Sequence, residues 1–329
     1  MIVNNVATKL AAVSTTPKPS RMTLGNVKKG KLQQPLRVVL FGQEGVGKST
    51  FGAGAPNPIF LCAESGTHNL DVARFPTPQA WPEVLEAVDV LTSEDHDYQS
   101  LVVDTLDWLE PLVFAHVIGS DGVDKNGRKA TSIESACGGF GKGYVAALDQ
   151  WRLFISKIEK LQTAKKMNVI FLAHTWIKSF ANPEGDNFDR YELKIDKRAS
   201  GKIKEWADAV LFATWDKGTV KDGGKAKGVS NGARLLHTEW SAAFDAKNRY
   251  GLPNQLPLSW DDFWSAVQEG SPASFEKLIA AARELASNVE GLPDKVETLI
   301  SKSGGDATKA AQVLDWVRGK VQLADQEGK

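Results

Sequence analysis

The chain has only two cysteines and no long apolar run. These two features argue against a disulfide-rich, zinc-ribbon or membrane-spanning protein. Cys62 and Cys137 are too few for a disulfide framework or a zinc ribbon, and this scarcity fits a reducing compartment. No apolar run approaches the roughly 18 residues of a membrane helix. The N-terminus lacks the continuous hydrophobic stretch of a signal peptide. We therefore expect a cytoplasmic protein with no membrane partner.

The chain also has no net charge, since 40 basic residues balance 40 acidic ones. Overall composition therefore neither supports nor excludes a nucleic-acid partner. Acidic residues are absent from residues 1–35, and Pro17 and Pro19 disfavour a helix there. The basic residues of this segment are Lys9, Lys18, Arg21, Lys28, Lys29 and Lys31. We predict a basic flexible arm over 1–35, either a solvated tail or an arm that touches a nucleic acid or a neighbouring subunit.

From Leu36 onward, short apolar runs alternate with helical patterns. The runs cover 36–41, 58–63, 100–105, 168–174 and 208–214, and the clearest helical patterns cover 80–91 and 144–165. Such runs suit strands that are buried on both faces of a parallel sheet. The alternation predicts an α/β fold, a mostly parallel central sheet flanked by helices, over residues 36–270.

Two further segments complete the predicted organisation. A glycine- and lysine-rich turn precedes residues 233–249, which we interpret as a hairpin added to the sheet edge. Residues 271–329 have helical periodicity and are predicted to form a small helical tail.

The most specific motif lies in the stretch FGQEGVGKST, residues 41–50. Gly42, Gly47, Lys48 and Ser49 satisfy the phosphate-loop pattern, in which backbone N–H groups wrap phosphates. The lysine of the pattern reaches the β- and γ-phosphates, and the hydroxyl binds Mg²⁺. A buried strand precedes the loop and a helix can begin at Lys48, which is the expected context. We predict an ATP and Mg²⁺ site whose loop residues are Gly42, Gln43, Glu44, Gly45, Val46, Gly47, Lys48, Ser49 and Thr50.

Three polar residues at strand ends extend this site. Asp104 ends an apolar strand, where it can hold the metal or, alternatively, cap the following helix. Glu64 follows the second buried strand and can deprotonate the attacking water, or it is a solvated acid. His174 ends the fourth buried strand and can sense the γ-phosphate, or it is a structural hydrogen-bonding residue.

The order of these residues resembles that of the RecA-like ATPase core. The stretch AKNRYGLP, residues 246–253, resembles the KNRFG motif of bacterial RadA and the similar signature of DnaB-type ring helicases. This resemblance implies that Lys247 and Arg249 reach the nucleotide of an adjacent subunit, where such an arginine speeds hydrolysis. The alternative is a solvated basic turn.

Residues 36–268 also resemble a phage-encoded group of RecA-like proteins that includes the Sak-type single-strand annealing recombinases. The stretches that carry this resemblance are PLRVVLFGQEGVGKST, LVVDTLDWLEPLV, GGFGKGY, VIFLAHTWIK and AKNRYGLP. The coupling residue of RecA is usually glutamine, whereas this chain has His174. The resemblance implies a protein of the host cytoplasm that forms a ring or filament on single-stranded DNA.

Two regions are predicted to face the DNA, residues 117–143 and 176–204. Glycines permit close backbone approach, and aromatic residues among cations suit the stacking of single-stranded bases. Phe140 and Tyr144 are candidates for stacking. The first region can instead be an ordinary solvated loop, and the second a mobile solvent loop or hairpin. The candidate cations are Lys125, Arg128, Lys129, Lys142, Lys178, Arg190, Lys197, Arg198 and Lys202.

The sequence thus favours an ATP-dependent single-stranded-DNA-binding recombinase or strand-annealing protein. A single-strand-binding protein is one further partner that this interpretation allows. The alternative is an ATPase switch that acts on a protein partner, such as a helicase loader, with the helical tail as its docking module. A small-molecule phosphotransferase is disfavoured, because it gives AKNRYGLP no role and the chain has no arginine-rich lid.

Overall fold

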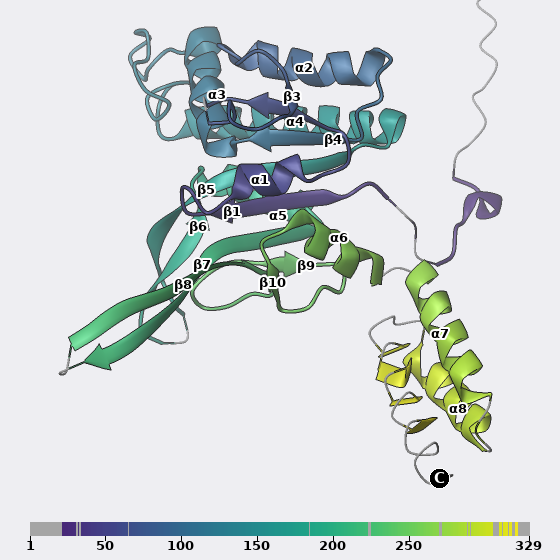
Figure 1. Ribbon diagram of the computed structural model, residues 1–329. Coiled ribbons are helices and arrows are strands. Elements are labelled where there is room, and N and C mark those ends of the chain that lie inside the picture. The colour runs from purple at the N-terminus through teal and green to yellow at the C-terminus, as the bar shows by residue number, and fades with distance from the viewer. Residues whose placement is uncertain are drawn as a thin grey trace, which may run out of the picture. The chain divides into compact units, whose positions relative to one another are not determined.

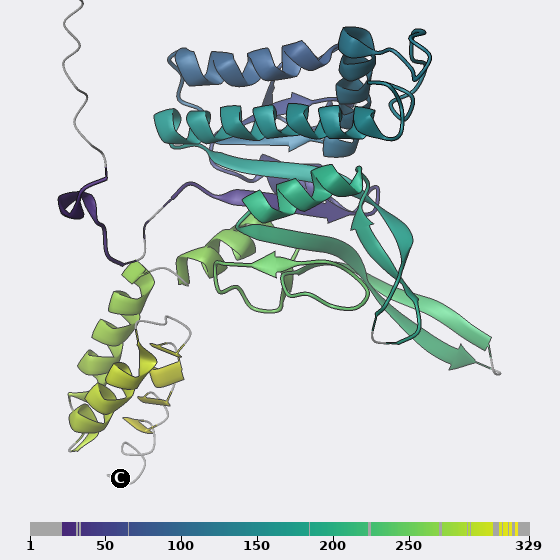
Figure 2. The ribbon, with the colours of Figure 1, turned by 180° about the vertical axis from the view of Figure 1, so that it is seen from behind.

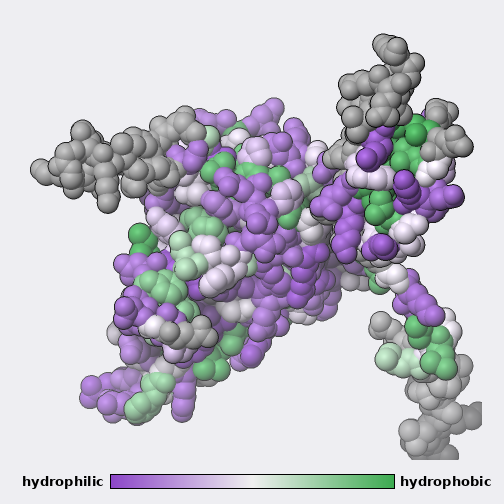
Figure 3. Space-filling view, turned by 90° about the horizontal axis from the view of Figure 1, so that it is seen from below, coloured by the Kyte–Doolittle hydropathy of each residue, from purple (hydrophilic) through white to green (hydrophobic). Residues whose placement is uncertain are grey.

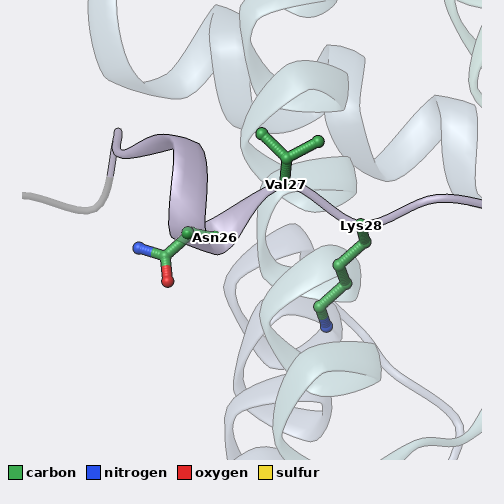
Figure 4. A pocket seen from close by; sticks show the side chains of 4 residues that line it. Asn26, Val27 and Lys28 are labelled. Atoms are coloured by element: carbon green, nitrogen blue, oxygen red, sulfur yellow. The ribbon is translucent and has the colours of Figure 1, made fainter.

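Figure 1 shows the computed structural model of the chain. The structure describes residues 22–321 except 31, 33, 65, 184, 223–224, 270–271, 288, 290, 305–308, 311, 315 and 318–319. Most of the predicted arm, including Lys9, Lys18, Arg21 and Lys31, lies outside the described residues. The chain divides into two units, 1–33 and 34–329. Within the first unit, a 3-10 turn at Leu24–Asn26 is exposed, and Gly25, Asn26, Val27 and Lys28 line a hollow beside it (Figure 4).

The second unit is built on a sheet of ten strands. These are β1 (Arg37–Gly42), β2 (Pro58–Cys62), β3 (Ala73–Arg74), β4 (Ser100–Asp104), β5 (Asn168–Phe180), β6 (Phe188–Leu193), β7 (Ala209–Asp222), β8 (Lys225–His237), β9 (Lys247–Asn248) and β10 (Gln255–Pro257). The order is β10-β8-β7-β1-β5-β4-β2-β3, with β6 paired to β5 and β9 to β7. All strand pairs from β7 to β3 along this order are parallel.

Helices cover both faces of this sheet (Figures 1 and 2). They are α1 (Lys48–Ala53), α2 (Trp81–Ser93), α3 (Leu106–Asp121), α4 (Lys142–Lys165), α5 (Lys197–Trp206) and α6 (Trp260–Glu269). One core contains Trp81 of α2 and Trp151 of α4, and the other contains Phe51 of α1 and Phe263 of α6. The sheet therefore lies between two helical layers.

The strand sequences explain this layering. Successive side chains of a strand point to opposite faces. In β1, Val39 and Phe41 join the first core while Val38 and Leu40 join the second. All four of these side chains are fully buried. The strand therefore needs consecutive apolar residues instead of alternating apolar and polar ones. The predicted fold class, an α/β fold with a mostly parallel sheet between helices, is confirmed.

Two expectations about the strands need correction. The strand predicted over 168–174 continues to Phe180 and pairs antiparallel with β6, so part of region 176–204 is a hairpin, which was one of the alternatives for that region. The glycine- and lysine-rich stretch is not a turn before a hairpin. It forms the facing strands β7 and β8 themselves, and residues 238–246 lie outside any strand. Turn-forming residues misled the prediction because the hydrogen bonds of a long ladder override local propensity.

The tail contains helices α7 (Pro272–Ala286) and α8 (Leu292–Ser303), followed by helical residues up to 321. These helices have a small core of their own, which includes Ala282, Val296 and Leu314. The predicted division at residue 271 stays a prediction. Within the described part of the chain, no helix is both long and apolar enough to cross a bilayer. The face in Figure 3 is mainly hydrophilic, with smaller apolar groups between.

Candidate nucleotide site

The phosphate loop lies at the carboxyl end of β1, in the middle of the parallel sheet. Glycine is needed at position 42, because a Cβ there would overlap the carbonyl oxygen of Ala213 on β7. Gly47 has a φ of 109°, a conformation that side chains disfavour. The chain then turns into α1 at Lys48. Both glycines therefore allow the loop to fold tightly between strand and helix.

Lys48 is held inside this loop. Its side chain is 5% exposed, and its Nζ donates hydrogen bonds to the carbonyl oxygens of Gly42 (3.2 Å) and Gln43 (3.0 Å). Burial lowers the pKa of Lys48, while the nearby carboxylates of Asp104 and Asp107 oppose this effect. An anion such as a phosphate, bound in this loop, would offset the desolvation of the Lys48 ammonium.

Ser49 and Asp104 meet beside the loop. The Ser49 hydroxyl donates to Asp104 Oδ2 at 2.6 Å, and Asp104 is 1% exposed. Burial raises the pKa of Asp104, and the hydrogen bond from Ser49 and the charge of Lys48 oppose this. The second oxygen, Oδ1, is buried and has no hydrogen-bond partner among the described residues. A buried oxygen without a partner beside a hydroxyl is a fitting pair of ligands for Mg²⁺.

The described residues contain no group of three or more His, Cys, Asp and Glu side chains that could hold a metal by themselves. Mg²⁺ is usually bound by one or two protein oxygens together with substrate phosphates and waters. Ser49 and Asp104 would hold the ion here.

The remaining predicted residues lie at neighbouring strand ends. The sheet register places Gly42 beside His174 and Cys62 beside Asp104. Glu64 follows β2 by two residues and is half-buried. Burial raises the pKa of Glu64, the charge of His174 opposes the rise, and the charge of Asp104 adds to it, so both groups are near enough to influence Glu64. The structure therefore brings together Lys48, Ser49, Glu64, Asp104 and His174.

His174 has a partner that the sequence did not reveal. Its backbone N–H and its Nδ1 contact the two oxygens of Asp107, at 2.8 and 2.9 Å. Burial favours a raised pKa for Asp107, but the hydrogen bonds and charge of His174 outweigh it, and the pKa is lowered. Both side chains are nearly buried. Asp107 therefore fixes the orientation of the His174 ring, and the only sequence signal was an acid in the first turn of α3.

Lys247 and Arg249 have contacts within their own chain. Lys247 Nζ donates to the carbonyl oxygens of Lys204 (2.8 Å), Glu205 (3.1 Å) and Ala207 (2.5 Å) at the end of α5. Arg249 is 58% exposed in its side chain and pairs with Asp208 at 3.2 Å. If Arg249 extended into solvent, only its exposed ion pair with Asp208 would be lost. Lys247, in contrast, stabilises the fold of its own chain. Their predicted action on an adjacent subunit stays a prediction.

One of the predicted DNA contacts does not fit. Arg190 is 6% exposed and lies 3.7 Å from Asp245, and its Cζ is 5.2 Å from the ring centroid of Phe180 and 5.9 Å from that of Trp240. Its aliphatic stem and guanidinium are therefore part of the packing of the β5–β6 hairpin, and it cannot serve as a surface cation. The sequence could not distinguish this position from an exposed one, because burial here depends on a distant tryptophan.

The other predicted cations remain accessible in different degrees. Lys125, Arg128, Lys129, Lys142 and Lys197 are exposed, while Lys178, Arg198 and Lys202 are half-buried. Arg198, in the second predicted region, lies over the ring of Tyr144, which directly follows the first region, 5.5 Å from its centroid. Phe140 is 86% exposed and has a φ of 54°. It follows Gly138 and Gly139, which also have positive φ, so the loop displays this ring to solvent.

A phosphate loop beside the Ser49–Asp104 pair, with Glu64 just past the end of β2, is typical of a P-loop ATPase. Residues 34–250 match the AAA domain family. The match covers more than half of the chain, and the chain therefore belongs to this family of P-loop ATPases. The crystal structure of the RadB recombinase is similar over 62% of this chain and 80% of that chain, with 12% identity and a TM-score of 0.32. No curated protein matches the chain.

Proposed function

We propose that the protein is an ATP-dependent single-stranded-DNA-binding recombinase or strand-annealing protein, with ATP bound between adjacent subunits. One observation carries the proposal. Strand β5 runs without a break from Asn168 to Phe180. His174 lies in its middle, at the nucleotide site, and the aromatic and basic hairpin begins within a few residues of it. A change at the γ-phosphate would therefore be transmitted to the hairpin through a single strand.

In the proposed hydrolysis, separate residues of the site bind the triphosphate, accept a proton and hold Mg²⁺. The backbone N–H groups of the phosphate loop and the Lys48 ammonium would hold the triphosphate. Glu64 would accept a proton from the attacking water, since it is a partly buried carboxylate with a raised pKa. Mg²⁺, when bound at Ser49 and Asp104, supplies charge neutralisation for the phosphates.

Cation–aromatic pairs on the hairpin support the assignment of DNA. Lys178 Nζ lies 3.8 Å from the centroid of the Trp176 ring, and the rings of Phe180 and Phe188 pack at 5.2 Å. Aromatic faces beside cations suit single strands, because each stacked base contributes about 1–3 kcal/mol. Exposed Phe140 and Lys142 would form a second contact, on the loop that leads into α4.

A second candidate is an ATPase switch that acts on a protein, for example a helicase loader. The observation that favours it is the separate small core of α7 and α8. A helical unit of this kind can recognise a partner without help from the ATPase sheet.

The first experiment is the ATPase rate with and without single-stranded DNA, for the wild type and for Arg249→Ala. Strong stimulation that the variant loses would support one nucleotide site shared by DNA and a neighbouring subunit. An equal rate with and without DNA in the wild type would contradict the recombinase proposal. Capture of a protein partner that survives nuclease treatment would then favour the switch.

A further inference from the structure

Arg234 lies directly against the phosphate loop, although the motif does not include it. A Cβ built on Gly47 would be 2.8 Å from Arg234 Nη1 and 3.7 Å from Arg234 Cδ. The guanidinium therefore touches the loop at the residue before Lys48. Arg234 belongs to β8, almost two hundred residues away in sequence, so only the fold brings the two together.

The position of Arg234 is fixed from two sides. Its guanidinium lies over the ring of Trp215, 4.8 Å from the centroid, and β7 and β8 pair these two residues directly. Its carbonyl oxygen accepts a hydrogen bond from the N–H of Leu258 at 3.0 Å. The Leu258 side chain also lies 3.7 Å from the Cβ position of Gly47. Together these three residues form a wall beside the loop.

The charge of Arg234 is not neutralised by this wall. Among the described residues no acidic side chain forms an ion pair with Arg234, and the residue is exposed. An aromatic face holds a guanidinium in place but leaves its N–H donors available for an anion. The nearest group built to hold an anion is the phosphate loop that Arg234 touches.

We propose that Arg234 is a further nucleotide-binding residue, which contacts the polyphosphate of the ATP held by its own chain. The inference rests on the proposed ATP site and adds a contact to it from the β7–β8 hairpin. This contact differs from that expected of Arg249, which is predicted to act on a neighbouring subunit. The recognition is of phosphate, for which the planar fork of arginine is suited.

The test is the affinity of the full chain for a fluorescent ATP analogue with Mg²⁺, in competition with ATP, ADP, inorganic tripolyphosphate and adenosine. For Arg234→Ala we expect about a tenfold to hundredfold loss for ATP and tripolyphosphate, which is typical of a charged hydrogen bond. Arg234→Lys should recover part of the loss. Arg152→Ala is the matched control, because Arg152 is an exposed arginine that pairs with Asp149 on its own helix.

The possible failures are distinguishable. A wild-type chain that does not bind ATP would overturn both the ATP site and the role of Arg234. Normal wild-type affinity with an unchanged Arg234→Ala variant would overturn the role of Arg234 alone. A loss for adenosine but not for tripolyphosphate would overturn the phosphate assignment. Circular dichroism and thermal unfolding verify that the variant is folded, and Arg234→Gln replaces it if it is not.

Discussion

Glu64 and Asp104 are both carboxylates near Lys48, yet their surroundings give them different roles. Asp104 is fully buried and already accepts a hydrogen bond from Ser49, whereas Glu64 is half-buried beyond a strand end. Glu64→Gln should keep ATP affinity within a few-fold and lower the hydrolysis rate about 10²- to 10⁴-fold, because a general base is removed. Single-turnover hydrolysis and nucleotide titration measure the two effects.

The matched comparison is Asp104→Asn, which should weaken Mg²⁺-dependent nucleotide binding as well as hydrolysis. If Glu64→Gln lost ATP affinity as strongly as Asp104→Asn, Glu64 would be a binding residue and the assigned base would be wrong.

Glu110 on α3 makes the stability of the fold depend on pH. Its Oε1 accepts a hydrogen bond from the Asp196 N–H at 2.7 Å. Its pKa is raised to about 7, chiefly by burial; the hydrogen bond opposes the rise, and the charges of Asp196 and Asp107 add to it. In the unfolded chain the pKa of a glutamate is 4.5. Between these values the folded state retains a proton that the unfolded state releases, so stability falls as pH rises through this window.

The variant Glu110→Gln should abolish this loss of stability at rising pH. At pH 8 we expect the variant to unfold at a higher urea concentration than the wild type, with a gain of up to about 3 kcal/mol. Near pH 4.5 the two should be similar, since the wild-type side chain is protonated in the folded state. Glu134→Gln, at an exposed position, is the control. The same difference between Glu110→Gln and wild type at both pH values would contradict the assignment.

At the scale of elements, Lys247 is the clearest case of a residue with two candidate roles. Its three hydrogen bonds go to carbonyl oxygens that have no helical partner at the end of α5. Lys247→Met keeps the aliphatic stem but removes these bonds. We expect a loss of about 1 kcal/mol in unfolding free energy, the usual effect of a cation at a helix C-terminus.

Thermal and urea unfolding of Lys247→Met and Arg249→Ala would separate the two roles. Arg249→Ala removes one exposed pair and should change stability by less than about 1 kcal/mol. If Lys247→Met were as stable as the wild type but inactive as an ATPase, its contact with α5 would be incidental and the action on a neighbouring subunit would be favoured.

The elements also show how far the sequence predicts this molecule. The buried parallel strands were predictable, because a strand with a helical layer on each side of the sheet needs apolar side chains on both faces. Runs such as residues 36–41 have this composition. The phosphate loop, Asp104 and Glu64 followed from residue type and strand-end position. The contacts of Asp107 with His174 and of Arg234 with the phosphate loop were not predictable, since packing brings together residues that are far apart in the sequence. The burial of Arg190 near two aromatic rings was missed for the same reason.

At the scale of the whole molecule, the proposal requires an active site made by two subunits. The chain provides both halves: the phosphate loop with Lys48, and Arg249 at the end of β9, exposed and paired only with Asp208 in the described structure. Lys48→Ala and Arg249→Ala should each be inactive as ATPases. An assembly in which one subunit acts on the next has heterologous interfaces, so it can combine an intact loop from one variant with an intact arginine from the other.

Mixing the two inactive variants in equal amounts therefore provides the decisive measurement. After co-assembly on single-stranded DNA, one interface in four would hold both intact halves, and we expect about a quarter of the wild-type ATPase rate. The mixture of Lys48→Ala with a double variant of Lys48 and Arg249 is the control and should stay inactive, because no intact loop is present. No recovery in the first mixture, with assembly confirmed by light scattering, would mean that Arg249 acts within its own chain, and the proposed site between subunits would have to be abandoned.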